Sequence, residues 1–190
     1  DFRSDFSDYT RSEFEKYIGK KVTMWPEDVL PVGHENGDFV PNPKPQYFME
    51  WIEFRAKVIH DFMEQARATV KGVNPDVDFG AYVGGWYEQY YTYGPNWASP
   101  SYAASRVFPS WATQKYDSFG FSDMLDVQII GAYASYNAVY GNYEWSMQGF
   151  CRLAKEKTRN APGLLIGGPD VGNWNWDGKA TISQELSAVT

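Results

Sequence analysis

Three acidic residues stand where a parallel β/α fold places functional groups, close to the ends of candidate strands. Glu88 follows the short apolar segment 77–83, Asp170 follows the apolar segment 163–168, and Asp1 opens the chain just before a candidate helix. In such folds the carboxyl ends of the strands carry the chemistry. Glycoside hydrolysis needs two carboxylates flanking the scissile bond, one as acid and one as nucleophile or base. We therefore take the three acids as candidate catalytic residues.

The residues around Glu88 are rich in aromatic side chains. Phe, Trp and Tyr make up 18% of the chain, and the loop 84–99 carries a dense group of them: Trp86, Tyr87, Tyr90, Tyr91, Tyr93 and Trp97. Pyranose rings present apolar C–H faces, so an indole or phenol face can bind them while its N–H or O–H meets hydroxyl groups. We expect residues 79–99 to form a strand and a loop with a carbohydrate-binding surface. The alternative is that several of these rings are buried against neighbouring helices.

A second group of rings and polar side chains, residues 173–177, follows Asp170. Two such groups at strand ends favour a ligand cleft along one rim of the sheet. The predicted substrate-binding residues come from both groups and from the start of the chain: Arg3, Trp86, Tyr87, Tyr91, Trp97, Asn173 and Trp174.

Each acid also has a structural interpretation. The chain has 24 Asp and Glu residues, and most of them are expected to be solvent-exposed charges. Asp170 could cap a turn with its side chain. The apparent place of Asp1 at a strand end could be an accident of where the sequence begins. Asp126 precedes its candidate strand, so we expect it at the opposite, structural end of the sheet.

The elements that position these groups can be predicted from the spacing of apolar residues. Side chains three and four apart predict a short helix over 8–19, which ends at Gly19, and a long amphipathic helix over 48–72. The Pro- and Gly-rich stretch 25–46 lies between them and predicts a long ordered loop.

Short apolar runs at 77–83, 126–133 and 163–168 predict buried strands, and a helix is predicted over 146–159. Helices and strands that alternate in this way are typical of a parallel β/α architecture. An eight-stranded barrel needs about 250 residues. The chain is therefore part of a barrel, or a short α/β domain completed in another way.

Composition excludes several classes of function. A net charge of −7 argues against a nucleic-acid partner held by phosphate contacts. No apolar run reaches the roughly 20 residues of a membrane span. The sequence has one cysteine, Cys151, and two histidines, His34 and His60, so no disulfide, His/Cys metal site or cofactor is expected. Oligomeric state does not follow from these numbers.

Several motifs together resemble bacterial glycosyl-hydrolase-like proteins distantly related to the alpha-amylase clan. They extend over most of the chain: Asp1-Phe2-Arg3, the helix at 11–19, Trp51-Ile52-Glu53-Phe54-Arg55, the Asn74-Pro75 turn, the aromatic loop, and Gly167-Gly168-Pro169-Asp170. The resemblance implies a (β/α)8 TIM barrel. Residues 1–190 would then be one partial barrel domain, from about the end of strand four to helix seven.

The resemblance also implies roles for the three acids. The clan places a nucleophilic Asp after strand four, an acid/base Glu after strand five and a transition-state-stabilising Asp after strand seven, which match Asp1, Glu88 and Asp170. The sequence departs from the clan in having no histidine after Asp1 or before Asp170. The resemblance also implies that the protein is bacterial and secreted, with an extracellular or periplasmic location.

Three functions follow as hypotheses. The first is a glycoside hydrolase that cleaves O-glycosidic bonds of an oligo- or polysaccharide with two carboxylates. The second is a non-catalytic glycan-binding protein on the same scaffold, since a fold does not settle function. The third is a structural fragment without activity of its own.

Overall fold

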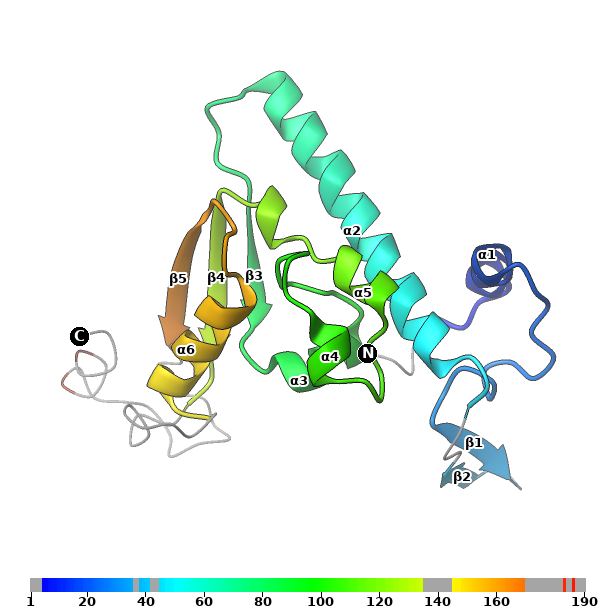
Figure 1. Cartoon of the computed structure of the whole chain (residues 1–190). Helices are drawn as coiled ribbons and strands as arrows, with labels where there is room; N and C mark the ends of the chain where they lie inside the picture. Colours follow the sequence, from blue (N-terminus) through cyan, green and yellow to red (C-terminus); the bar gives the residue numbers. More distant parts are fainter. Residues whose placement is uncertain are drawn as a thin grey trace. The chain divides into compact units, whose positions relative to one another are not determined.

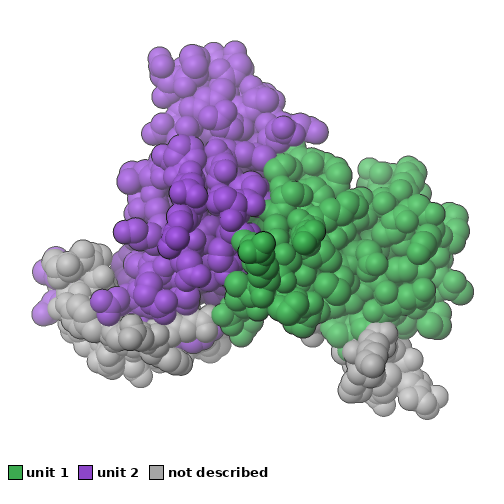
Figure 2. Space-filling model, in the orientation of Figure 1, with its two compact units in different colours: residues 1–62, 88–96, 103–119 green, residues 63–87, 97–102, 120–190 purple. Residues whose placement is uncertain are grey.

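The computed structural model describes residues 5–35, 38–41, 45–134 and 145–169, together with Ser183 and Leu186. The chain divides into two compact units (Figure 2). Unit 1 comprises residues 1–62, 88–96 and 103–119, and unit 2 comprises residues 63–87, 97–102 and 120–190.

Unit 1 begins with helix α1, Asp8–Ile18. The Ser7 hydroxyl accepts a hydrogen bond from the Thr10 N–H and caps the first turn. Gly19 ends the helix in the left-handed region, with φ of 69°, where a residue without Cβ is favoured. The predicted helix and its glycine stop are both confirmed.

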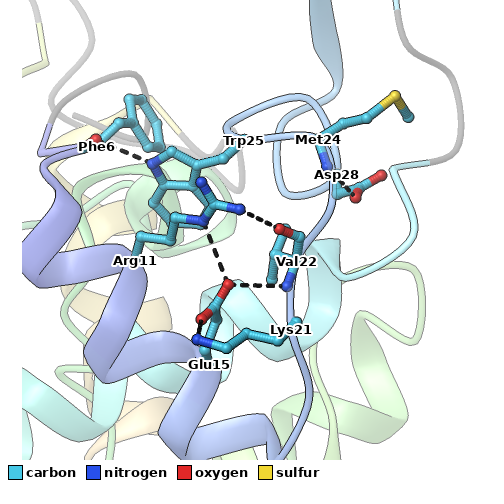
Figure 3. Close-up of polar contacts among 8 residues, drawn as sticks. All are labelled: Phe6, Arg11, Glu15, Lys21, Val22, Met24, Trp25 and Asp28. Atoms are coloured by element: carbon cyan, nitrogen blue, oxygen red, sulfur yellow. Dashed lines mark hydrogen bonds and ion pairs between the residues drawn. The ribbon is translucent and has the colours of Figure 1, made fainter.

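The segment after α1 is hydrogen-bonded back onto the helix (Figure 3). Trp25 Nε1 donates to the Phe6 carbonyl over 2.9 Å, and the Val22 N–H donates to the Glu15 carboxylate over 3.0 Å. Lys21 Nζ lies 2.5 Å from the second Glu15 oxygen. The hydrogen bonds from Lys21 and then Val22 hold the pKa of Glu15 below its usual value. These contacts fix α1 against residues 20–25.

The Pro- and Gly-rich stretch contains a short antiparallel hairpin within the predicted loop. Strand β1 is Val32–Glu35 and strand β2 is Asp38–Pro41, with Val32 opposite Pro41. The sequence prediction missed this hairpin, because its strands are short and have prolines at their ends.

Helix α2, Phe48–Val73, runs for 26 residues and confirms the predicted amphipathic helix. Its first turns bury Trp51 and Phe54 against Phe14 of α1 and Trp25. The Trp51 ring centroid lies 5.3 Å from that of Phe14 and 5.5 Å from that of Trp25, both edge-to-face. Full burial of a large apolar side chain contributes about 1.5–3 kcal/mol. Several such side chains are buried together here, and this aromatic cluster forms a main part of the core of unit 1.

Short helical segments follow. They are α3 (Tyr87–Tyr90), the 3-10 turn η1 (Tyr91–Tyr93), α4 (Ala104–Val107), α5 (Gln114–Ser118) and the 3-10 turn η2 (Ser122–Met124). The Thr113 hydroxyl caps α5 by accepting from the Tyr116 N–H. Arg55 Nη1 on α2 donates to the Thr92 carbonyl over 3.0 Å, which ties residues 88–96 to α2 within unit 1.

Unit 2 is built on a parallel sheet with strand order β3-β4-β5 (Figure 1). The strands are β3 (Gly80–Gly84), β4 (Val127–Ala132) and β5 (Leu164–Pro169). Helix α6, Met147–Lys157, packs against β4 and β5 and buries Phe150 and Ala154. The predicted strands and the predicted helix at 146–159 are thus confirmed in place, with boundaries shifted by a few residues. The predicted burial is wrong for β5, where Leu164 is 60% and Ile166 39% exposed, and for the first part of β3.

Asp126 lies directly before β4, at the end of the sheet where we expected a structural role. Its carboxylate accepts from the Phe79 N–H over 2.8 Å and pairs with Lys71 Nζ over 2.7 Å. The Lys71 contact first, and then the Phe79 N–H, hold the pKa of Asp126 below its usual value. The residue links the end of α2 to the start of the sheet within unit 2.

The predicted TIM barrel is wrong, although the α/β class is right. The described part of the chain contains one parallel sheet of three strands and one two-stranded hairpin. A barrel places a covering helix after each strand. The connection from β3 to β4 instead holds only helical segments of five residues or fewer, and its residues 88–96 and 103–119 belong to unit 1. The spacing of apolar residues predicts where the strands are, but it does not predict which elements pack on them.

Candidate functional site

A row of glycines crosses the carboxyl-terminal end of the parallel sheet. Gly84, Gly131 and Gly168 are paired in register on β3, β4 and β5. A Cβ at Gly84 would lie 2.6 Å from the Trp86 ring, and a Cβ at Gly131 would lie 2.1 Å from the Tyr82 hydroxyl oxygen. The two aromatic side chains occupy the space that larger residues would fill, so they lie directly over the backbone of the sheet.

Four aromatic residues, Tyr82, Trp86, Tyr133 and Trp145, surround this row, and we call them the aromatic rim. The Trp86 ring lies 5.0 Å from Tyr133 and 6.3 Å from Trp145, nearly parallel to the latter at 12°. The Tyr82 and Tyr133 hydroxyls are hydrogen-bonded at 2.7 Å. Tyr82 is 53% exposed, and Trp86, Tyr133 and Trp145 are partly buried. The rim therefore presents ring surface and hydroxyl groups together.

The local sequence explains how the rim forms. Side chains two residues apart on a strand share a face, so Tyr82 and Gly84 lie on the same side of β3. The Gly85 N–H continues the pairing by donating to the Gly131 carbonyl over 2.9 Å. A Cβ at Gly85 would lie 2.5 Å from Phe150, so glycine allows the strand end to approach α6 closely. Trp86 then leaves the strand above Gly84.

On the other side of the rim, α6 positions Trp145. The Ser146 hydroxyl accepts from the Gly149 N–H over 2.9 Å and caps the helix directly after Trp145. Trp86 and Trp145 both pack on a buried cluster formed by Ala132, Ala134, Met147 and Phe150. The rings are thus supported from below by the core of unit 2.

The chemistry available at the rim is that of recognition. Partly exposed aromatic rings bury the apolar face of a ligand, and their O–H and N–H groups meet its polar edges. The rim also lies at the carboxyl ends of parallel strands, where α/β folds bind ligands.

Two of the predicted sugar-binding rings are core residues. Tyr87 is 2% exposed and Trp97 is fully buried, and their rings meet edge-to-face at 4.9 Å. Lys157 Nζ lies 5.4 Å from the centre of the Tyr87 ring, and Gln128 Nε2 donates to the Trp97 carbonyl over 3.0 Å. Neither ring presents a face that a ligand can reach. For these two residues the alternative we named, burial in the core, describes the structure.

Tyr91 is half-buried in unit 1. Its ring stacks on Trp111 at 4.4 Å and 22°. Burial raises the pKa of the Tyr91 hydroxyl. One face of the ring is therefore already occupied by another side chain, whereas Trp86 belongs to unit 2 and forms part of the rim.

Of the three predicted catalytic acids, the structure describes one. Glu88 is exposed at the start of α3 and belongs to unit 1, so it lacks the aromatic cage that an acid catalyst would use for desolvation. Asp1 and Asp170, with the predicted ligand-binding residues Arg3, Asn173 and Trp174, lie outside the described residues. The two-carboxylate mechanism stays a prediction.

The part of the chain that the structure describes contains no cluster of three or more His, Cys, Asp or Glu side chains able to hold a metal ion. It also contains no helix with the length and apolar character needed to cross a membrane.

Sequence reasoning missed three rim residues: Tyr82, Tyr133 and Trp145. Tyr82 lies inside the predicted strand 77–83 and is not among the predicted substrate-binding residues. The signal that could have found it is the glycine that follows two residues later on the same strand face. Gly131 and Gly168 also stand near the ends of the other two predicted strands, two residues after Ile129 and Ile166.

Comparison with known proteins finds a relative by sequence but no solved structure with a similar fold. No family model and no solved structure matches the chain. An "S-layer-related protein" of Niallia circulans is 31% identical over 144 residues, which cover 68% of this chain and 8% of that protein. The chain thus corresponds to a small part of a much longer relative.

Proposed function

We propose that the aromatic rim binds glycan chains, and that this chain is a glycan-binding part of a protein displayed outside the cell. The observation that carries the proposal is the glycine row, which lets Tyr82 and Trp86 lie over the sheet backbone at the strand ends. Such a surface fits a long, flat ligand better than a compact one.

The energetics suit a saccharide. Apolar burial contributes about 25 cal/mol per Å², so a sugar face on one or two rings gives a modest interaction that neighbouring sugar units along a chain can repeat. The hydrogen-bonded Tyr82 and Tyr133 hydroxyls offer donor and acceptor capacity beside the rings.

The extracellular part of the proposal has its own support. The relative's name, "S-layer-related protein", concerns the surface layer of a bacterium, and this chain matches 8% of that protein. An outside location agrees with the location implied by the sequence resemblance. Detection of the native protein in the cell-wall fraction rather than the cytosol would test it.

The binding test is affinity electrophoresis in gels that contain dissolved neutral polysaccharide, with a starch, a β-glucan and a glycol chitin as probes. The native chain should be retarded by at least one of them, and Trp86→Ala should reduce its affinity about tenfold, equivalent to about 1.4 kcal/mol. Leu164→Ala is the matched control, since Leu164 is an exposed apolar residue at the opposite end of β5. No retardation with any probe, or equal retardation of Trp86→Ala, would refute the proposal.

Hydrolysis of the bound glycan is not part of this proposal. The exposed position of Glu88 gives it no support, and the other two predicted acids lie outside the described residues.

A further inference from the structure

Unit 1 contains a cleft of its own, with a volume of about 620 Å³. It is lined by α1, by the first half of α2 and by Tyr93 and Gly94, all within unit 1. We call it the α1–α2 cleft. Its volume lies within the roughly 300–1,000 Å³ typical of ligand pockets, and none of the predicted catalytic or substrate-binding residues lines it.

Aromatic rings supply the apolar surface of the cleft. Trp51 and Phe54 lie stacked at 5.7 Å and 26° on α2. Tyr93 is 52% exposed, and Tyr9 is also exposed. The cleft therefore has a buried indole on its wall and accessible phenol rings at its opening.

The indole N–H of Trp51 is a donor without an acceptor. Trp51 is 1% exposed, and its Nε1 has no hydrogen-bond partner among the residues that the structure describes. A buried donor left unsatisfied costs about 1–3 kcal/mol. The N–H is enclosed by the chain, so we assign it no contact with a ligand; the Trp51 ring is a wall residue whose surroundings change when the cleft is filled.

Four of the charged side chains that line the cleft form ion pairs with one another, and the Asp5 carboxylate is hydrogen-bonded. Lys16 pairs with Glu13 at 2.5 Å, and Lys57 pairs with Asp61. The Asp5 carboxylate accepts from the Thr10 hydroxyl over 2.9 Å.

Arg55 lies over the Trp51 ring, 5.9 Å from its centre. Burial lowers the pKa of Arg55 to about 10, against the opposing effect of the Asp5 charge. The lining contains three carboxylates, from Asp5, Glu13 and Asp61, and three cations, from Lys16, Arg55 and Lys57. This balance of charge gives an anionic or cationic ligand no net attraction.

We propose that the α1–α2 cleft is a second binding site, specific for a neutral saccharide unit whose ring packs on the exposed Tyr93 and Tyr9 beside the wall formed by Trp51. The ligand class rests on the function proposed above, whereas the place does not. An apolar helix would not suit this cleft, because it would bury both ion pairs and desolvate their charges. A polyanion would meet Glu13 and Asp61 without a compensating excess of cations.

The test observes the indole N–H groups directly. The whole chain, labelled with ¹⁵N, is titrated with maltotriose, cellotriose and tri-N-acetylchitotriose, and with trigalacturonic acid as the anionic comparison. Trp51→Phe assigns one of the eight tryptophan signals, since it removes the N–H and keeps an aromatic ring. We expect the Trp51 signal to move with at least one neutral trisaccharide and not with trigalacturonic acid. Tyr93→Ala should weaken the binding at least fivefold.

Phe62→Ala is the matched control, because Phe62 is an exposed aromatic residue on α2 that does not line the cleft. It should bind like the native chain. If Trp51→Phe does not fold, the Tyr93→Ala and Phe62→Ala pair still decides the outcome through the affinities alone.

Two outcomes separate this inference from the proposed function. The Trp86 signal is the one that the Trp86→Ala variant lacks. If it moves while that of Trp51 does not, and Tyr93→Ala binds normally, the cleft inference is refuted and the rim proposal stands. If neither signal moves with any trisaccharide, the cleft inference is refuted, and the polysaccharide gels decide the rim proposal. Equal movement of the Trp51 signal with trigalacturonic acid would refute the neutral specificity.

Discussion

The aromatic rim of unit 2 and the α1–α2 cleft of unit 1 bring aromatic rings to the surface in two different ways. At the rim, Tyr82 and Trp86 lie over glycines, and their rings occupy the space that a Cβ atom would fill in any other residue. In the cleft, Trp51 and Tyr93 line a hollow whose charged residues pair with one another. The rim is therefore suited to the flat side of a chain, and the cleft to a single unit that enters it. Aromatic content alone does not distinguish these surfaces from a core.

The largest expected effect separates core rings from rim rings. Trp97→Ala removes a fully buried indole and should destabilise the protein by about 3–5 kcal/mol. Trp86→Ala removes a partly buried ring and should cost clearly less. Urea unfolding of both variants measures the difference. Equal losses for the two would erase the distinction between the rim and the core of unit 2.

The next effect tests whether glycine makes the rim. Gly131→Ala places a Cβ 2.1 Å from the tip of Tyr82, which has to swing away. We expect glycan affinity at the rim to fall several-fold with little loss of stability, because a side-chain tip moves and not the backbone. Binding at the cleft should be unchanged.

Gly72→Ala serves as the control for this substitution. A Cβ at Gly72 in α2 meets nothing within 4 Å, and alanine in a helix should stabilise the protein by about 0.5–1 kcal/mol. Normal glycan binding by Gly131→Ala would contradict the role given to the row.

A smaller effect compares the two carboxylates that hold elements together, Glu15 in unit 1 and Asp126 in unit 2. Both have a pKa below the usual values of 4.5 and 3.8. The stability that each contributes is therefore complete above its usual pKa and is lost as the pH falls through the lowered one. Glu15→Gln and Asp126→Asn should lower stability at pH 7 and flatten its dependence on pH below about 4.5. Thermal unfolding from pH 2 to 7 measures this, and an unchanged acid slope in both variants would contradict the assigned contacts.

The smallest expected effect concerns Glu88. Because its side chain is exposed, Glu88→Gln should change stability by less than about 0.5 kcal/mol and leave binding at both surfaces unaltered. The measurement is the release of reducing sugar from the polysaccharides that bind. If the native chain releases reducing sugar and Glu88→Gln does not, the predicted catalytic role of Glu88 is supported.

Local patterns in the sequence were sufficient to locate the main elements. The Ser7 cap, the Gly19 stop and the apolar spacing of α2 act within a few residues, so α1 and α2 could be predicted closely. The three strands were recognisable as apolar runs for the same reason. The division into two units depends on where residues 88–96 and 103–119 pack, and no local pattern records that.

The two proposed binding surfaces were harder to predict than the helices and strands. Tyr87, Trp97 and Trp86 look alike in sequence, yet the first two are buried and the third lies at the rim. The difference lies in the residues that each ring contacts: Trp86 lies over Gly84, whereas Tyr87 lies beside Lys157. The sequence does not show that the rings of the cleft come together, because they come from positions far apart in the chain, such as Tyr9, Trp51 and Tyr93.

The near-parallel indoles of Trp86 and Trp145 make the rim an optical reporter. Two indoles held 6.3 Å apart at 12° experience a fixed asymmetric environment, and near-ultraviolet circular dichroism is sensitive to such fixed packing. A sugar face that settles beside Trp86 changes the surroundings of one chromophore of the pair. The protein therefore carries its own label-free signal for occupation of the rim, and the Trp86→Ala variant lacks it.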